Sequence, residues 1–83
     1  MPRKSIYDAK YRRLLARLRE ARKLAGLDQV EVSRKLKYAE NFCNRIESGE
    51  RRLQVVDLAS LARLYDLPLR FFLPDTPAED GKK

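Results

Sequence analysis

Apolar residues recur at helical spacing through the first 25 residues of the sequence, and a glycine follows directly. Such a stripe, with basic residues on either side, predicts one long amphipathic helix. Ser5 and Asp8 resemble a capping box at its start, and Gly26 is expected to end it because glycine adopts the left-handed conformation at little cost. The stripe consists of Tyr7, Tyr11, Leu14, Leu15, Leu18, Ala21 and Ala25.

Two short helices are expected next. Asp28 and Glu31 form a second capping signature, and Val32 and Leu36 give the second helix an apolar side. After a turn at 37–39, the third helix should run over about 40–48 and stop at Gly49. Its inward residues should be Phe42, Cys43 and Ile46.

A fourth helix is predicted over about 55–65, and Pro68 is well placed in the first turn of a short fifth helix with Leu69 and Phe72. No strand pattern is present, so we expect an all-α, compact five-helix domain. Residues 1–13 are a basic extension that starts the first helix, 14–73 form the domain, and 74–83 read as a disordered tail. The inward residues of the fourth helix should be Val55, Leu58, Leu61, Ala62 and Tyr65.

The net charge of +7 lies entirely in the first helix: residues 1–25 hold nine Lys/Arg against two acids, and the rest is balanced. This favours polyanion binding only slightly over a solvated helix face. Histidine is absent and Cys43 is the only cysteine, which fits a reducing compartment. We expect no metal, no cofactor, no catalysis and no membrane span. The first helix could lie on an anionic membrane only if its apolar residues left the core of the domain.

Arg22 and Glu47 both fall beside apolar stripes, where a single buried charge is costly. The simplest remedy is a bidentate ion pair that ties the first helix to the third. The alternative is that both side chains stay wet at the rim.

The stretch "LREARKLAGLDQVEVSRKLKYAENFCNRIESGERR" resembles the helix-turn-helix domain of the Cro and phage-repressor (Xre-type) regulators. The resemblance runs over 14–67, about two-thirds of the chain. It implies that the second helix crosses the DNA backbone and the third enters the major groove. The matched features are Leu18, Arg22, Gly26-Leu27, Gln29, Glu31, Leu36, Ile46-Glu47, Gly49-Glu50 and Leu61-Ala62.

The resemblance also implies roles for individual residues. Those that would face base edges are Glu40, Asn41, Asn44 and Arg45, since arginine suits guanine, asparagine suits adenine, and glutamate can accept from cytosine. The residues that would bind phosphate are Gln29, Ser48, Arg51 and Arg52. For both groups of residues the alternative is that they form an ordinary solvated loop or helix face with no role in binding. Glu40 is an acid aimed at a polyanion, so it either reads cytosine or rejects wrong sites.

The sequence departs from the family at several positions. Lys37 replaces the glycine of the turn, which predicts a longer or differently shaped turn. Ala39 replaces a Ser/Thr cap, so DNA phosphate or water would have to satisfy the amide donors there. Ser33 replaces a small alanine, and its hydroxyl needs a partner. Cys43 stands at an aliphatic position and is expected to be core material, not a redox switch.

Two segments leave alternatives open. Residues 2–4 are either a basic arm that follows a groove or a disordered start. Phe71, Phe72 and Leu73 provide more apolar surface than a short terminal helix can hide, which suggests either a symmetric dimer contact or a cover for the domain's own base.

The leading hypothesis is a sequence-specific regulator of transcription, and more specifically a repressor, that binds double-stranded DNA as a homodimer on an inverted repeat. With no sensor or catalytic domain in the sequence, it would act by occupancy, in the cytoplasm at the nucleoid. The alternative is an antitoxin that binds a protein toxin as well as its own promoter, but only the tail or the N-terminal extension offers a partner segment.

Overall fold

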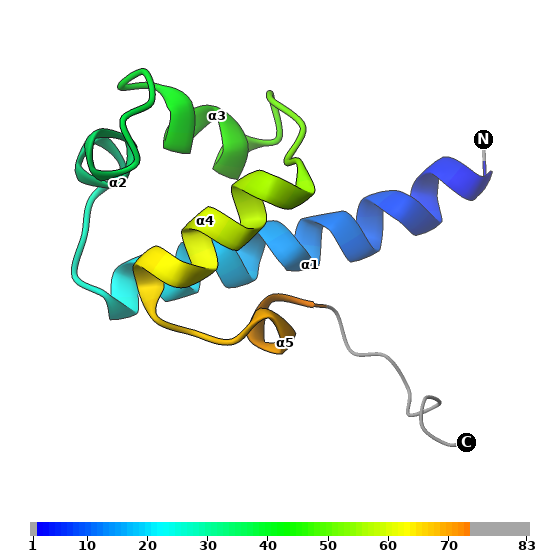
Figure 1. Ribbon diagram of the computed structural model, residues 1–83. Helices are drawn as coiled ribbons and strands as arrows, with labels where there is room; N and C mark the ends of the chain where they lie inside the picture. Colours follow the sequence, from blue (N-terminus) through cyan, green and yellow to red (C-terminus); the bar gives the residue numbers. More distant parts are fainter. Residues whose placement is uncertain (1, 74–83) are drawn as a thin grey trace.

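A computed structural model describes residues 2–73, with side chains from residue 9 onward. Figure 1 shows the longest helix running along the domain, with the fourth crossing it, the second and third on one side and the fifth on the other. The described residues form helices, turns and loops, as the all-α prediction requires. The helices are α1 (Pro2–Leu24), α2 (Gln29–Lys35), α3 (Phe42–Ser48), α4 (Val55–Tyr65) and α5 (Leu69–Phe72).

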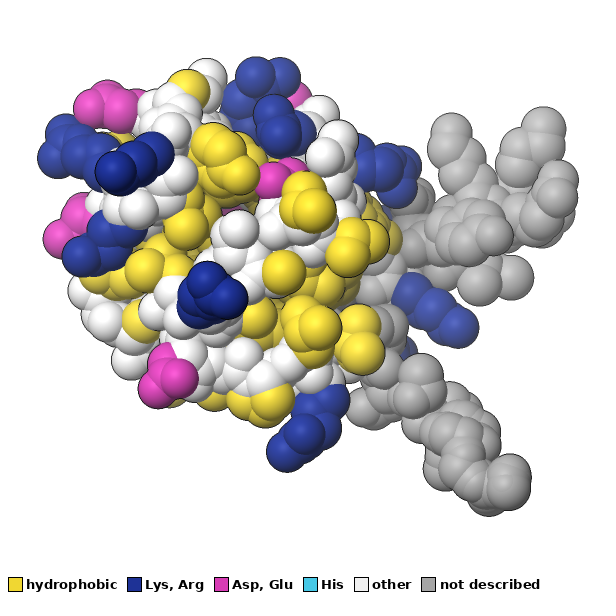
Figure 2. All heavy atoms as spheres, in the orientation of Figure 1, with side chains coloured by type: hydrophobic (Ala, Val, Ile, Leu, Met, Phe, Trp, Pro, Cys, Tyr) yellow, Lys and Arg dark blue, Asp and Glu magenta, His cyan; other side chains and the backbone are white. Residues whose placement is uncertain are grey.

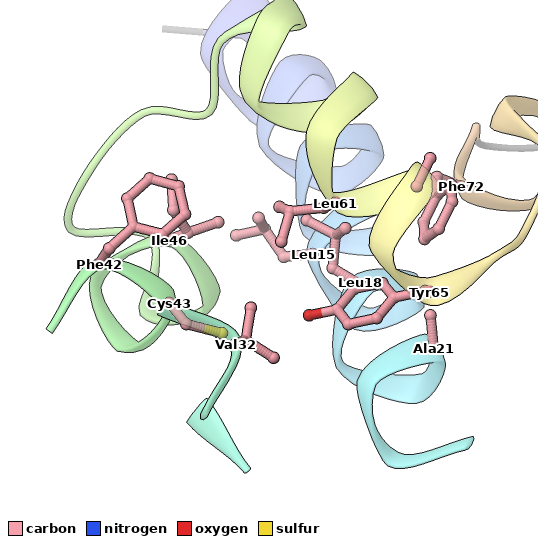
Figure 3. Packing of buried hydrophobic residues seen from close by; sticks show 11 residues of the cluster. Leu15, Leu18, Ala21, Val32, Phe42, Cys43, Ile46, Leu61, Tyr65 and Phe72 are labelled. Atoms are coloured by element: carbon pink, nitrogen blue, oxygen red, sulfur yellow. The ribbon is translucent and has the colours of Figure 1, made fainter. Parts of the chain in front are cut away.

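The core lies between α1, α3 and α4. Figure 3 shows Leu15 of α1, Ile46 of α3 and Leu61 of α4 pointing toward one another. Leu18 and Ile46 are each only 1% exposed, and burying side chains of this size contributes about 1.5–3 kcal/mol apiece. This shared core fixes the position of α3 relative to α1.

Local sequence signals set most helix ends as predicted. Asp28 Oδ1 accepts from the amide of Glu31 at 2.8 Å, and Glu31 Oε1 accepts from the amide of Asp28 at 2.9 Å, which completes the capping box of α2. Gly26 and Gly49 have φ values of 75° and 87°. Both glycines therefore take the left-handed conformation expected where a helix stops.

Two helix starts differ from the prediction. α1 begins at Pro2 and not at Ser5, because proline has a helical φ and no amide hydrogen to lose in the first turn. Residues 2–4 are accordingly helical and continue α1. α3 begins at Phe42, so Glu40 and Asn41 belong to the turn before it, where the Phe42 amide donates to the Ala39 carbonyl at 2.9 Å. The predicted tail, 74–83, lies outside the described residues.

The turn between α2 and α3 places Lys37 in the left-handed conformation, which glycine adopts most easily. Lys37 takes a φ of 65°, and a left-handed lysine costs on the order of 1 kcal/mol. Ser33 stabilises the same corner: its hydroxyl donates to the Gln29 carbonyl at 3.1 Å and accepts from the Cys43 amide at 3.0 Å. That buried hydroxyl satisfies an α3 amide that Ala39 cannot cap.

Three residues differ from their predicted surroundings: two that were expected in the core are exposed, and one that was expected at a dimer contact is buried. Val55 is 83% exposed because it is the first residue of α4 and lies outside the core, and Ala25 is exposed just beyond the end of α1. Phe72 is 0% exposed and belongs to the domain's own core, as Figure 3 shows. A side chain with no accessible surface cannot contact a second copy, so the dimer role predicted for Phe72 was wrong.

Phe71 is also held by its own domain. The guanidinium of Arg17 lies 5.4 Å from the centroid of the Phe71 ring, and its Nη1 donates to the Phe71 carbonyl at 3.2 Å. The rings of Phe71 and Phe72 meet edge to face at a centroid distance of 5.2 Å. Both therefore cover the base of the domain, and Leu73, 47% exposed, is the one residue of the predicted contact that remains largely on the surface.

Candidate nucleic-acid interface

α3 divides its side chains cleanly between core and solvent. Phe42, Cys43, Ile46 and Glu47 are buried. On the opposite side, Asn44 and Ser48 are exposed within the helix, Asn41 is exposed just before it, and Arg45 is partly exposed. These four positions follow the helical repeat and so share one face. Seven residues make a rod about 10 Å long, and Figure 1 shows it at the edge of the domain.

Arg22 and Glu47 meet as expected from their positions on the two stripes. Arg22 Nε donates to Glu47 Oε2 at 2.7 Å, and Nη2 donates to Oε1 at 3.1 Å. Arg22 Nη1 also donates to the carbonyl of Leu27 at 3.1 Å, which ties down the loop after α1. Both side chains are largely buried, at 12% and 2% exposure. The bidentate pair holds α3 against α1 in one orientation.

Glu47 stays ionised in this setting. Burial alone would raise its pKa, but the hydrogen bonds from Arg22 and Gln29 and the charge of Arg22 outweigh burial and lower it. Cys43 donates to Glu47 Oε2 at 3.4 Å. Burial, followed by the neighbouring Glu47 charge, raises the pKa of the Cys43 thiol to about 12. The thiol is therefore protonated at neutral pH and fits the core role predicted for it.

Gln29 and Asn44 are joined in a way that the sequence did not reveal. Gln29 Nε2 donates to Glu47 Oε1 at 2.9 Å, and Gln29 Oε1 accepts from Asn44 Nδ2 at 3.2 Å. Gln29 therefore spends much of its amide inside the protein, which leaves only one N–H of Nε2 for a phosphate. Residues 15 positions apart give no pattern from which this bond could be predicted.

Acidic side chains lie beside the basic ones on this surface. Arg34 and Glu40 form an exposed pair at 3.1 Å, so the acid predicted to face bases has a cationic partner in its own domain. Arg45 Nε is 3.4 Å from Glu50 Oε2, an ion pair without a hydrogen bond, since that Nε has no hydrogen-bond partner. The alternation of acids and bases along the sequence is the signal that could have indicated such pairing.

The loop between α3 and α4 is fastened to both neighbouring elements. The guanidinium of Arg51 lies 5.2 Å from the Phe42 ring centroid, and that of Arg52 lies 5.0 Å from the Tyr11 ring centroid. The Leu53 amide donates to the Tyr11 hydroxyl at 2.7 Å. Both arginines are exposed. The guanidinium groups of Arg51 and Arg52 are therefore held next to the end of α3 before any ligand binds.

Arg51 has a second partner in Asp57, whose carboxylate is 3.6 Å from its Nη2. Ser48 Oγ donates to the Arg45 carbonyl at 3.2 Å and accepts from the Glu50 amide at 3.3 Å, so this hydroxyl shapes the helix exit. Within residues 9–73 no three His, Cys, Asp or Glu side chains gather as a metal site would require. No described helix combines the length and apolar character needed to cross a bilayer.

Comparison with known proteins agrees with this geometry. Residues 13–70 match the family model described as "Helix-turn-helix domain". The chain is also similar to the HTH-type transcriptional regulator PrpR of Mycobacterium tuberculosis (strain ATCC 25618 / H37Rv), with 33% identity over 63 residues that cover 76% of this chain and 13% of that protein. The chain thus spans about an eighth of that relative. No solved structure gives a significant match. The match over most of its length shows that this chain belongs to the helix-turn-helix domain family.

Proposed function

We propose that this chain is a sequence-specific regulator, and more specifically a repressor, that places α3 in the major groove of double-stranded DNA. The observation that carries the proposal is the division of α3: one face is locked into the core, and the other presents Asn41, Asn44 and Arg45 together. B-DNA has a major groove about 12 Å wide, which admits a single helix. Arginine pairs with guanine and asparagine with adenine at the groove edges.

Phosphate contacts would fix the register of α3 on the duplex. Arg51 and Arg52 follow the helix directly and rest on aromatic rings, so less side-chain freedom is lost when they bind. Ser48 lies at the same exit, and Gln29 begins α2 with one amide hydrogen to spare. Three of these residues thus lie at or just beyond the C-terminal end of α3, and the fourth, Gln29, contacts Asn44.

The acids on this surface favour specific over non-specific binding. The segment 28–54 carries six Lys/Arg against five Asp/Glu, so its net charge is close to zero. A nearly neutral surface gains little from counterion release alone. Glu40 and Glu50 add local repulsion wherever phosphates or bases do not match. Affinity would then depend on correct contacts.

A homodimer on an inverted repeat is the assembly that we propose, with occupancy of the site blocking polymerase. Leu69 and Leu73 of the α5 region are 50% and 47% exposed and offer a small apolar contact on the side away from α3. Figure 2 shows further hydrophobic side chains gathered over α4 on the face in view. To read an inverted repeat, the dimer would have to place both α3 helices on one face, at the spacing of the half-sites.

Selection of bound duplexes from a random pool tests the proposal. The expected product is an inverted repeat whose half-sites lie about 10–10.5 base pairs apart. Arg45→Ala should relax one position by about 1–3 kcal/mol, whereas Arg51→Ala should weaken all duplexes alike and reduce the salt slope by about 1. Arg63→Ala removes the same charge from α4 and is the matched control. Equal losses on selected and scrambled DNA for Arg45→Ala would refute its base-reading role, and a loss confined to the selected DNA for Arg51→Ala would refute its phosphate role.

A further inference from the structure

Glu47, Gln29 and Asn44 form a hydrogen-bonded chain that runs from the core to the exposed face of α3. Glu47 is almost fully buried and Asn44 is exposed, with Gln29 between them. The chain starts in the Arg22 pair and ends on a side chain that the proposed function assigns to base reading. Its direction can be worked out from the chemistry of its first member.

A carboxylate can only accept hydrogen bonds. Both Glu47 oxygens already receive donors from Arg22, at 2.7 and 3.1 Å, and Arg19 Nε lies 3.6 Å from Oε1. A neighbouring amide can therefore approach Oε1 in one way, with its NH2 group first. Gln29 Nε2 does so at 2.9 Å, and the buried charge thereby fixes which end of the Gln29 amide points outward.

The outward end of Gln29 is its carbonyl oxygen, which is likewise an acceptor only. Asn44 must then present its own NH2 group to Gln29, as it does at 3.2 Å. Oδ1 of Asn44 and one remaining N–H are left for a ligand. A free asparagine amide could reverse its two ends at little cost, but reversal here would set two acceptor oxygens against each other.

We infer that Glu47 acts through Gln29 to hold Asn44 with its carbonyl oxygen as the presented group, and that Asn44 consequently selects an amino-bearing base. In the major groove the amino donors are N6 of adenine and N4 of cytosine, whereas O6 of guanine and O4 of thymine are acceptors. Gln29 is a positioning residue in this arrangement. The inference rests on the proposed function and adds a rule for one position of the half-site.

The test is duplex selection with four proteins: the unaltered chain, Gln29→Met, Asn44→Ala and the double variant. The unaltered chain should show one half-site position, lost in Asn44→Ala, at which adenine or cytosine exceeds guanine or thymine about fivefold, the worth of one net hydrogen bond. Gln29→Met should flatten that position and leave the others. In the Asn44→Ala background it should change nothing further there.

Preferences are ratios within one pool, so a uniform loss of affinity through the Gln29 phosphate contact cancels. Thermal unfolding of each variant establishes that it is folded, and a purely structural role for Gln29 would lower the melting temperature without acting on one position. A preserved preference in Gln29→Met, flattening of every position, or a guanine or thymine preference at the Asn44 position overturns the inference alone. Failure of the unaltered chain to select any sequence overturns the proposed function and the inference with it.

Discussion

Among substitutions that remove one partly exposed charged side chain, Arg22→Met should lower the free energy of unfolding of the domain most. The change keeps an unbranched side chain at the site and leaves Glu47, whose side chain is 2% exposed, without its bidentate partner. Oε2 would keep only the Cys43 thiol at 3.4 Å, and Oε1 would keep Gln29 at 2.9 Å with Arg19 at 3.6 Å. Burial of the remaining charge would then be poorly compensated.

Breaking a buried pair by removing one partner costs about 3–5 kcal/mol. Arg19 is half exposed and can move closer, which places the expected loss near about 3 kcal/mol, the lower end of that range. A domain of this size has a total stability of roughly 4–12 kcal/mol, so the variant should be marginally folded. The melting temperature should fall by roughly 12–24 °C.

The loss should depend on pH in a defined direction. In the unaltered protein the pKa of Glu47 is depressed, so its contribution is present above the ordinary value of 4.5 and is lost as pH falls through the folded-state pKa. Without Arg22, burial should raise the pKa of Glu47 above 4.5. The penalty in the variant is then relieved as the carboxylate takes up a proton. The difference in the free energy of unfolding between the unaltered protein and Arg22→Met should therefore decrease from pH 6 to pH 4.

Urea unfolding followed by circular dichroism at several pH values measures both effects. Arg12→Met, on the exposed side of α1, is the matched control and should change the free energy of unfolding by less than about 0.5 kcal/mol. Adding Glu47→Met to Arg22→Met should recover much of the loss, because an apolar pair replaces the buried ions. A loss below about 1 kcal/mol, or a gap that is constant with pH, would refute the reasoning.

Three further predictions concern single side chains. Lys37→Gly should raise the free energy of unfolding by about 1 kcal/mol, because φ is 65° there, and thermal unfolding measures it. The Cys43 thiol, with its raised pKa of about 12, should react with a thiol reagent only as fast as the domain unfolds, as absorbance at increasing urea would report. Glu50→Gln should tighten binding to selected and scrambled duplexes alike by about two- to fivefold at low salt, since it removes a negative charge from the surface that faces the phosphates; fluorescence anisotropy measures this.

Each of these three predictions has a control or a result that would contradict it. Lys37→Ala should bring no gain, since alanine is strained at the same φ, and an equal gain would point to charge and not to backbone strain. Rapid labelling of Cys43 in the folded protein would contradict its burial. A Glu50→Gln effect confined to the selected duplex, or one that is unchanged by salt, would mean that Glu50 reads a base.

Local sequence signals predicted most of the secondary structure because they act over a single turn. Asp28 and Glu31 cap α2 from three positions apart, and Gly26 and Gly49 stop helices through their own backbone freedom. The apolar spacing likewise identified the inner face of α3. The Arg22–Glu47 pair was also predicted, from two charges beside apolar stripes and from the family resemblance, and the structure shows it.

Tertiary packing decided what depends on distant residues. Phe72 is buried because α1 and α4 cover it, and Val55 is exposed because α4 begins outside the core, although both look equally apolar in the sequence. The bond between Gln29 and Asn44, and the rings beneath Arg51 and Arg52, join segments whose separation along the chain carries no periodic signal. Periodicity tells which side of a helix is apolar, but only the packed fold determines which neighbour that side meets and which polar groups remain free for a ligand.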